Sequence, residues 1–167
     1  MPRIRLLFKY WLPILIWMLV IFSASGDSGS FEHTSRIIGP FLHRLFPHIS
    51  PRATHRIVTA IRKCAHLTEY AILALMVLRA LRQPEKNDTR PWWSWREAGF
   101  SVLFVAIYAV TDEFHQRFVR SRGPSVHDVL IDISGAIIGL LVFWCFWRWR
   151  SKRISASEKP LEEKSST

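Results

Sequence analysis

Ionisable side chains interrupt three stretches of the sequence that are otherwise apolar. The first stretch contains Arg62, Lys63, His66, Glu69 and Tyr70. On a helix, Lys63, His66 and Tyr70 would share one face, with Arg62 and Glu69 on its flank. A histidine beside a carboxylate can serve as a general base, and lysine or arginine can bind an anion. This stretch has the residue types to bind a charged ligand or to act on one.

The other two stretches supply most of the carboxylates. The second contains Asp112, Glu113, His115 and Gln116, and the third contains Asp128 and Asp132. In the second, Asp112, His115 and Gln116 share a helix face. The third continues in the same line with Gly135 and Gly139, whose small-xxx-small spacing predicts close packing against another helix.

These residues must be positioned by apolar blocks of membrane-spanning length. Hydrophobic residues make up 49% of the chain and are concentrated in blocks, which predict spans at about 6–23, 61–81, 98–118 and 128–147. Each block has roughly 20 residues, enough to cross a hydrocarbon layer of about 30 Å. We therefore expect an all-α fold, an integral membrane bundle of four transmembrane helices in one domain over residues 1–150.

Two segments lie outside the predicted spans. The polar connection 26–60 contains Ile37, Ile38, Phe41, Leu42, Leu45 and Phe46 at helical spacing. This pattern predicts a short amphipathic helix in the first outer loop, on the membrane surface or capping the bundle, ended by Pro47 and Pro51. The cytoplasmic tail 151–167 consists mainly of Ser, Lys and Glu, and we expect it to be disordered.

The charge distribution predicts an orientation. The net charge is +10, but Lys and Arg flank the apolar blocks and form no stripe on a soluble fold, which argues against nucleic-acid binding. Basic residues are in excess on the side of the N-terminus, and the Trp92–Trp95 and Trp144–Trp149 clusters fall on that same side. We expect a multi-pass protein of the cytoplasmic (inner) membrane with both termini inside.

Alternating chain direction brings all three polar stretches to one end of the bundle, on the outer side, where Ser23 and Ser25 end the first span. Charged groups inside a membrane usually face the bundle interior and mark functional sites. The alternative is a salt-bridge network that only fixes helix packing. The candidate ligand-binding residues are Lys63, His66, Glu69, Tyr70, Asp112, Glu113, Gln116, Arg120, Arg122, Asp128 and Asp132.

Catalysis and metal binding are weaker interpretations of the same residues. Histidines and carboxylates are acceptable metal ligands, but no spacing here is diagnostic of a metal site, and we predict neither a metal nor a cofactor. No nucleophile elbow or serine triad is recognisable. If the site is catalytic, the candidates are His66, Glu69, Asp112 and His115.

Three ordered motifs resemble the VanZ-like family of membrane proteins. They are the segments Arg62–Leu73, Thr111–Arg122 and Asp128–Gly139, which are similar to "RKxxHxxEYxxL", "DExxQxFxxxR" and "DxxxDxxGxxxG". The resemblance covers roughly residues 11 to 145. It implies an envelope protein, and the family takes its name from a member linked to low-level teicoplanin resistance. It implies no reaction, because the mechanism of the family is unsettled.

Three hypotheses follow, and the sequence leaves them open. The leading one is a non-enzymatic protein whose outer pocket binds a lipid-linked or anionic ligand, such as a cell-wall precursor or a glycopeptide. In it, Lys63, Arg120 and Arg122 contact the anion. The second is a membrane-embedded enzyme that acts on a lipid-linked substrate. The third is a purely structural cluster. Membrane lipids are expected partners in each case, and the oligomeric state is left open.

Overall fold

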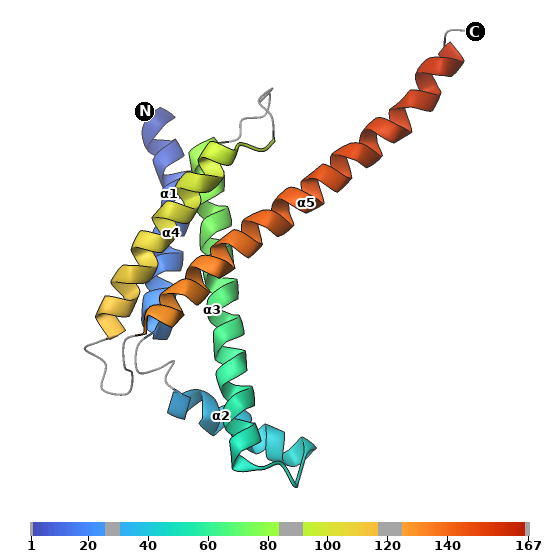
Figure 1. Ribbon diagram of the computed structural model, residues 1–167. Coiled ribbons are helices and arrows are strands. Elements are labelled where there is room, and N and C mark those ends of the chain that lie inside the picture. The colour runs from blue at the N-terminus through green and yellow to red at the C-terminus, as the bar shows by residue number, and fades with distance from the viewer. Residues whose placement is uncertain (1, 26–30, 84–91, 117–124, 166–167) are drawn as a thin grey trace.

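The computed structural model describes residues 2–25, 31–83, 92–116 and 125–165 of the 167-residue chain. The described residues are all-helical, without strands, and form α1 (Pro2–Ser25), α2 (Phe31–Leu45), α3 (Pro51–Arg82), α4 (Trp95–Gln116) and α5 (Val126–Ser165), as Figure 1 shows. The predicted all-α class is therefore confirmed.

Three of these helices are long and apolar enough to cross a membrane. The candidate spans are Ile4–Ser25 in α1, Pro51–Arg82 in α3 and Val126–Arg153 in α5. α4 has 22 residues but is not among them. Its apolar middle lies between Arg96 and Glu97 at one end and Asp112 and Glu113 at the other, which lowers its mean hydropathy. The protein is thus a helical membrane protein. By length and composition alone, α4 does not qualify as a candidate span.

α3 differs most from its predicted bounds, because it begins at Pro51, well before residue 61. Pro51 does not end a preceding helix as the sequence predicted. It occupies the first turn of α3, where a proline costs no hydrogen bond. Ser50 caps this turn, with its Oγ accepting a hydrogen bond from the Ala53 N–H at 3.2 Å. The helix ends at Arg82 and is capped by Gln83, which has a left-handed backbone (φ 42°) and whose N–H donates to Arg79 O.

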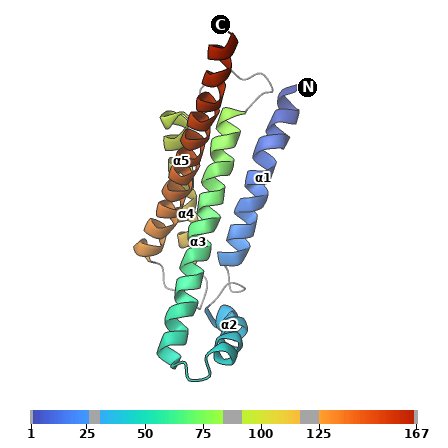
Figure 2. The ribbon, with the colours of Figure 1, turned by 90° about the vertical axis from the view of Figure 1, so that its right-hand side faces the viewer.

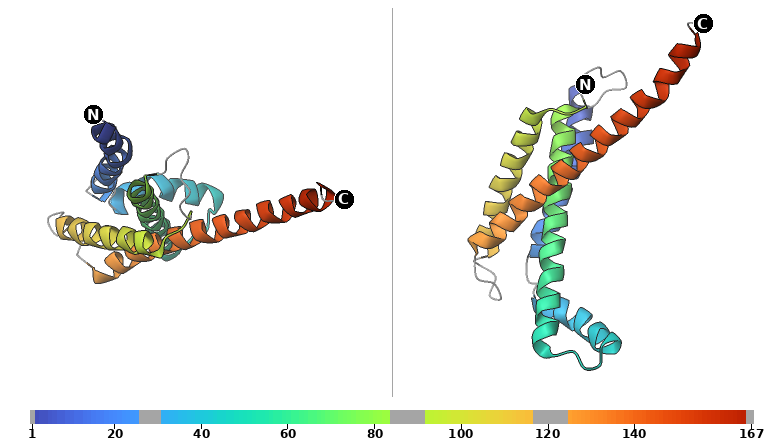
Figure 3. Two further views of the ribbon diagram at one scale, coloured as in Figure 1. Left: turned by 90° about the horizontal axis from the view of Figure 1, so that it is seen from above. Right: turned by 45° about the vertical axis from the view of Figure 1, so that its right-hand side comes forward.

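α5 is also longer than predicted. It has 40 residues and continues as a helix to Ser165, through most of the segment 151–167 for which we expected disorder. The Lys and Glu residues of this segment are good helix formers, so a helix can extend beyond the packed bundle although the segment also contains Pro160. In Figure 1 and in the view from above in Figure 3, this part of α5 points away from the other helices.

α3 is the central helix of the bundle. It contacts every other helix, and its contact with α5 is the most extensive. α1 and α4 run alongside it, and α5 crosses it obliquely (Figures 1 and 2). α2 lies across the first turns of α3, beyond the ends of α1 and α4. We call the end where α1 and α4 finish and α5 starts the polar end, and the opposite end the tryptophan end.

The bundle has a narrow apolar core and an apolar exterior. Fully buried side chains include Ile14 and Ile21 of α1, Leu73 and Val77 of α3, and Val105 of α4. Many large apolar side chains point outward along the helices, among them Leu15, Leu19, Leu103, Ile107, Val110 and Val142. A continuous apolar exterior of this kind suits contact with lipid chains.

Gly135 and Gly139 allow the close contact between α3 and α5. A Cβ atom on Gly135 would lie 2.5 Å from Leu67 O, and one on Gly139 would lie 2.7 Å from Ala71 Cβ. Real Cβ atoms do not approach neighbours so closely, so only glycine fits here without a shift of α3 or α5. Both glycines thus lie where the small-xxx-small spacing predicts helix packing.

Candidate functional site

Asp112 is the centre of the hydrogen-bonded network at the polar end. Its carboxylate is 1% exposed, and its Oδ2 accepts hydrogen bonds from Ser25 Oγ (2.7 Å), Tyr70 OH (3.3 Å) and Gln116 Nε2 (3.1 Å). The three donors come from α1, α3 and α4. One carboxylate oxygen therefore joins the ends of α1 and α4 to the middle of α3 through charge-assisted hydrogen bonds.

His66 lies between two carboxylates on the neighbouring side of the same region. Its Nδ1 is 3.7 Å from Glu69 Oε2 and 3.8 Å from Asp132 Oδ1. Both distances are too long for hydrogen bonds and suit ion pairs of a protonated imidazole. The ring also stacks on Tyr70, with centroids 6.5 Å apart. A histidine of α3 is thus poised beside carboxylates of α3 and α5.

Among the described residues of this cluster, carboxylates outnumber basic side chains. Asp132 is buried, and Asp112, Asp128, Glu113 and Glu69 all act on it electrostatically. Among the described residues that act on these carboxylates, the basic side chains are His66 and Arg62, and Arg62 interacts with Asp128. The buried cluster therefore favours protons or hydrogen-bond donors, and it is poorly suited to an anion in its interior.

Two atoms inside the cluster have unmet hydrogen-bonding capacity. Within the part of the chain that the structure describes, Asp112 Oδ1 and His66 Nδ1 are buried and make no hydrogen bond. His115 Nδ1 is in the same situation, while its ring stacks on Phe22 at 4.0 Å. Buried polar atoms normally have partners, and native exceptions often mark functional sites. Asp112 Oδ1 could accept a hydrogen bond from a ligand, because its other oxygen already holds the helices together.

Several supporting contacts were not predicted from the sequence. Trp17 Nε1 donates to Glu69 O at 3.0 Å, and Tyr108 OH donates to Met18 O at 2.6 Å, which ties α1 to α3 and α4. The backbone N–H of Ser125 donates to Glu113 Oε1 just before α5 begins. A buried indole N–H or phenol O–H in the middle of an apolar span requires a polar partner. The sequence could therefore have indicated that Trp17 and Tyr108 make hydrogen bonds, but not with which residues.

The structure brings together most of the predicted ligand-binding residues, and Lys63 is the one predicted anion contact among the described residues. His66, Glu69, Tyr70, Asp112, Glu113, Gln116, Asp128 and Asp132 lie at the polar end. Lys63 is exposed, although the helical wheel put it on the face of His66 and Tyr70. Arg120 and Arg122 lie outside the described residues. The cluster is therefore acidic in its interior.

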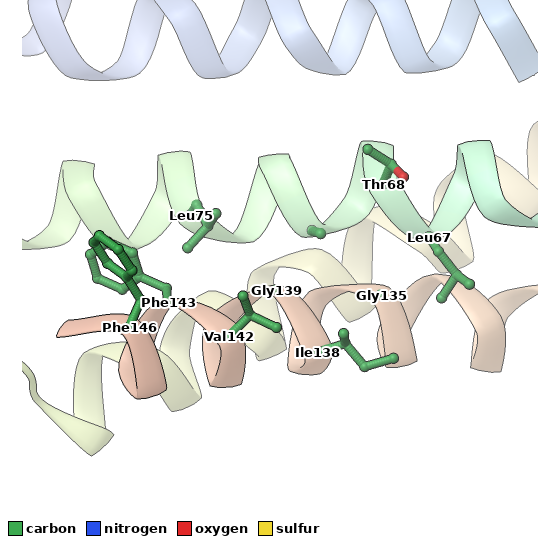
Figure 4. Close-up of a pocket in the computed structure, with 10 residues that line it drawn as sticks. Leu67, Thr68, Leu75, Gly135, Ile138, Gly139, Val142, Phe143 and Phe146 are labelled. Carbon is green, nitrogen blue, oxygen red and sulfur yellow. The ribbon is translucent and has the colours of Figure 1, made fainter. Parts of the chain in front are cut away.

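An apolar groove runs between α3 and α5 and begins one helical turn from the cluster. It has a volume of about 480 Å³, within the range of small-ligand sites. Its wall is formed by Leu67, Thr68, Ala71, Leu75, Gly135, Ile138, Gly139, Val142, Phe143 and Phe146 (Figure 4). The Thr68 hydroxyl already donates to Cys64 O at 2.8 Å, so the groove offers hydrocarbon contact almost throughout.

The described residues contain no group of three or more His, Cys, Asp or Glu side chains arranged to hold a metal ion. His66 is close to two carboxylates, but Asp112 and His115 are directed to other partners. The chemistry this cluster can perform with its own residues is hydrogen bonding and proton transfer.

Comparison with known proteins gives one clear match. No curated protein and no solved structure matches the chain. A family model described as VanZ/LLP1 matches residues 10–148, which include every helix of the bundle except α5's extension and the first turns of α1. The match includes all three polar stretches and the glycine pair that holds α3 against α5. The chain therefore belongs to the VanZ/LLP1 family of membrane proteins.

Proposed function

We propose that this protein binds a lipid-linked ligand of the cell envelope without transforming it, with the ligand headgroup at the polar end. The observation that carries the proposal is that, among the described residues, Oδ1 of the buried Asp112 and Nδ1 of His66 make no hydrogen bond. A cluster built only to hold helices would satisfy these atoms internally, because a buried unsatisfied polar atom costs about 1–3 kcal/mol.

The excess of carboxylates specifies the chemistry of the headgroup. Hydroxyl, amide and ammonium groups would donate hydrogen bonds to Asp112, Asp132 and Glu69, as the sugars and peptide of a lipid-linked cell-wall precursor or a glycopeptide can. A phosphate of the same ligand would meet basic residues at the rim, for which Lys63, Arg120 and Arg122 remain the candidates. The hydrocarbon chain of the ligand would lie in the groove between α3 and α5.

We further propose that α4 is the fourth membrane span. Its 22 residues extend about 33 Å at 1.5 Å per residue, and it packs along both α3 and α5. Its buried Asp112, Glu113 and Gln116 are compatible with a membrane interior because they face other polar groups of the bundle.

The orientation we propose has both termini inside and the polar end outside, in the cytoplasmic membrane. It is supported by basic residues at the tryptophan end. α2 would then lie in the outer interface, because its exposed Ile37, Phe41 and Leu45 form one stripe with Arg36 and Arg44 nearby. A ligand that reaches the polar end from the outer leaflet would also connect the protein to glycopeptide susceptibility, which its family membership suggests.

One observation favours a second candidate, a membrane-embedded enzyme. His66 lies between Glu69 and Asp132 in the arrangement of a general base oriented by a carboxylate. The two candidates differ in what they demand of Asp132. An enzyme would lose nearly all activity in Asp132→Asn, whereas a binding protein would lose affinity in steps as carboxylates are removed.

The test is native mass spectrometry of lipids that co-purify with the protein in mild detergent. We compare the wild type with Asp132→Asn and with Glu97→Gln, a matched loss of one carboxylate at the tryptophan end, where Glu97 pairs with Arg82 at 3.7 Å. The proposal expects a specific lipid-linked species on the wild type and on Glu97→Gln, reduced at least about tenfold on folded Asp132→Asn. Equal lipid retention by all three proteins would contradict it.

A further inference from the structure

The tryptophan end contains a second concentration of functional groups, which the proposed function does not use. Trp92 stacks on Trp147 and Trp95 packs on Trp144, with ring centroids 6.1 and 5.6 Å apart. Trp93 contacts Trp95 edge to face at 5.2 Å. The residues that lead into α4 are thus packed on α5 through their indole rings, which form one aromatic layer.

Three arginines of α5 lie on the rings of this layer. The guanidinium carbon is 5.3 Å from the Trp144 ring for Arg148, 5.8 Å from the Trp147 ring for Arg150, and 4.1 Å from the Trp149 ring for Arg153. All three arginines are exposed. A guanidinium that lies over an aromatic ring is held in place, while its N–H edge stays free for a planar, bidentate contact with phosphate. We call Arg148, Arg150, Arg153 and the indoles they cover the tryptophan–arginine layer.

Charge at this end is strongly one-sided. Among the described residues, the neighbours of the layer include Arg96 and Lys152, both exposed. At the tryptophan end, the acidic side chain among the described residues is Glu97, and its Oε2 lies 3.7 Å from Arg82 Nε. The arginines of the layer therefore have no carboxylate to neutralise them within the described residues, and the surface attracts anions.

The depth of the layer identifies the source of those anions. Trp144, Trp147 and Trp149 lie near the end of the candidate span Val126–Arg153. Along α5, Asp128 and Trp149 are separated by about 30 Å at 1.5 Å per residue, close to the thickness of the hydrocarbon layer. With the polar end at one membrane surface, the layer lies at the other, at the depth that indoles prefer. Phosphate groups of lipids are the anions present at that depth.

We propose that the tryptophan–arginine layer is a binding site for anionic phospholipids of the leaflet at this end, independent of the ligand at the polar end. The guanidiniums of Arg148, Arg150 and Arg153 contact the lipid phosphates, and the indoles beneath them lie against the glycerol and upper chain region. The site fixes the tilt of α5 and the attachment of α4 to it, because Trp95 of α4 packs on Trp144 of the layer.

The experiment measures lipid binding to the purified full chain by native mass spectrometry, with phosphatidylglycerol and phosphatidylcholine of identical acyl chains as probes. The test variant is Arg148→Gln/Arg150→Gln/Arg153→Gln. The matched control is Arg36→Gln/Arg44→Gln/Arg52→Gln, which removes the same charge from exposed arginines near the polar end. Each basic residue at a membrane surface contributes roughly fivefold in affinity.

We expect the wild type and the control to prefer phosphatidylglycerol, and the test variant to lose about tenfold or more of that preference while its phosphatidylcholine binding is unchanged. An equal loss in the control would assign the effect to net charge and overturn the proposal, as would a wild type without preference. If the triple variant does not fold, Arg153→Gln alone should lower the preference several-fold, and no change would contradict the proposal. Neither result depends on a ligand at the polar end.

Discussion

The two ends of this bundle differ in the burial and in the partners of their charged groups. At the polar end, carboxylates, a histidine and hydroxyls from four helices gather around the buried Asp112 and Asp132, and their partners are chiefly each other. At the tryptophan end, the charged groups are exposed guanidiniums that lie on indole rings. Burial makes the hydrogen-bonded groups at the first end costly to alter, whereas exposure means that substitutions at the second end cost little folding energy.

This difference in burial suits the two ends to two kinds of ligand binding. A buried cluster with unmet hydrogen-bonding capacity suits one specific ligand, because few groups can enter and satisfy it. An exposed basic and aromatic surface suits a class of ligands, because its contacts are electrostatic and tolerant of geometry. Stability and lipid selectivity should therefore respond differently to substitutions at the two ends.

The largest effect on folding is expected from Asp112→Ala. The substitution removes the acceptor of hydrogen bonds from Ser25, Tyr70 and Gln116, and leaves their buried donors unsatisfied. We expect a loss of about 3–5 kcal/mol in the free energy of unfolding in mixed micelles. Asp112→Asn, which keeps an acceptor, should lose less. A loss below about 1 kcal/mol for Asp112→Ala would show that this carboxylate does not hold the helix ends together.

Gly135→Ala is expected to be the next most damaging change. Its new Cβ would lie 2.5 Å from a backbone oxygen of Leu67, which cannot move without displacing α3. We expect a destabilisation of about 1–3 kcal/mol by the same unfolding measurement. The matched control is Gly99→Ala in α4, where a Cβ would meet nothing within 4 Å. It should be neutral or stabilising by up to about 1 kcal/mol. Similar effects of the two substitutions would contradict the packing role of Gly135.

The convergence at the polar end could be predicted from the sequence, because consecutive predicted helices alternate in direction and three of them carry polar residues at corresponding ends. The partners of Asp112 could not be predicted in the same way. They depend on how far each helix is rotated, because Lys63 and His66, three positions apart on nearly the same face, are exposed and half-buried respectively. The prediction that Pro51 ends the preceding helix was wrong, because proline is common both just after a helix and in the first turn of one. The hydrogen bond from Trp17 to Glu69 O required knowledge of which helices are neighbours.

The smallest effect on folding is expected at the tryptophan end. Arg153→Gln removes a guanidinium 4.1 Å from the Trp149 ring, at an exposed position. We expect a loss of no more than about 0.5–1 kcal/mol in the free energy of unfolding. The same variant should still lower phosphatidylglycerol preference, so stability and lipid selectivity are separable here. A destabilisation comparable to that of Asp112→Ala would remove the contrast between the two ends.

The most direct test of the central claim is His66→Gln, measured for stability and for retention of lipid-linked ligand in the same preparation. His66 Nδ1 makes no hydrogen bond among the described residues, so its loss should cost folding little, less than about 1 kcal/mol. If the polar end is a ligand site, the folded variant should nevertheless lose the co-purifying lipid-linked species at least about tenfold. A clear loss of stability with full retention of that species would instead make the polar end a packing network and contradict our account.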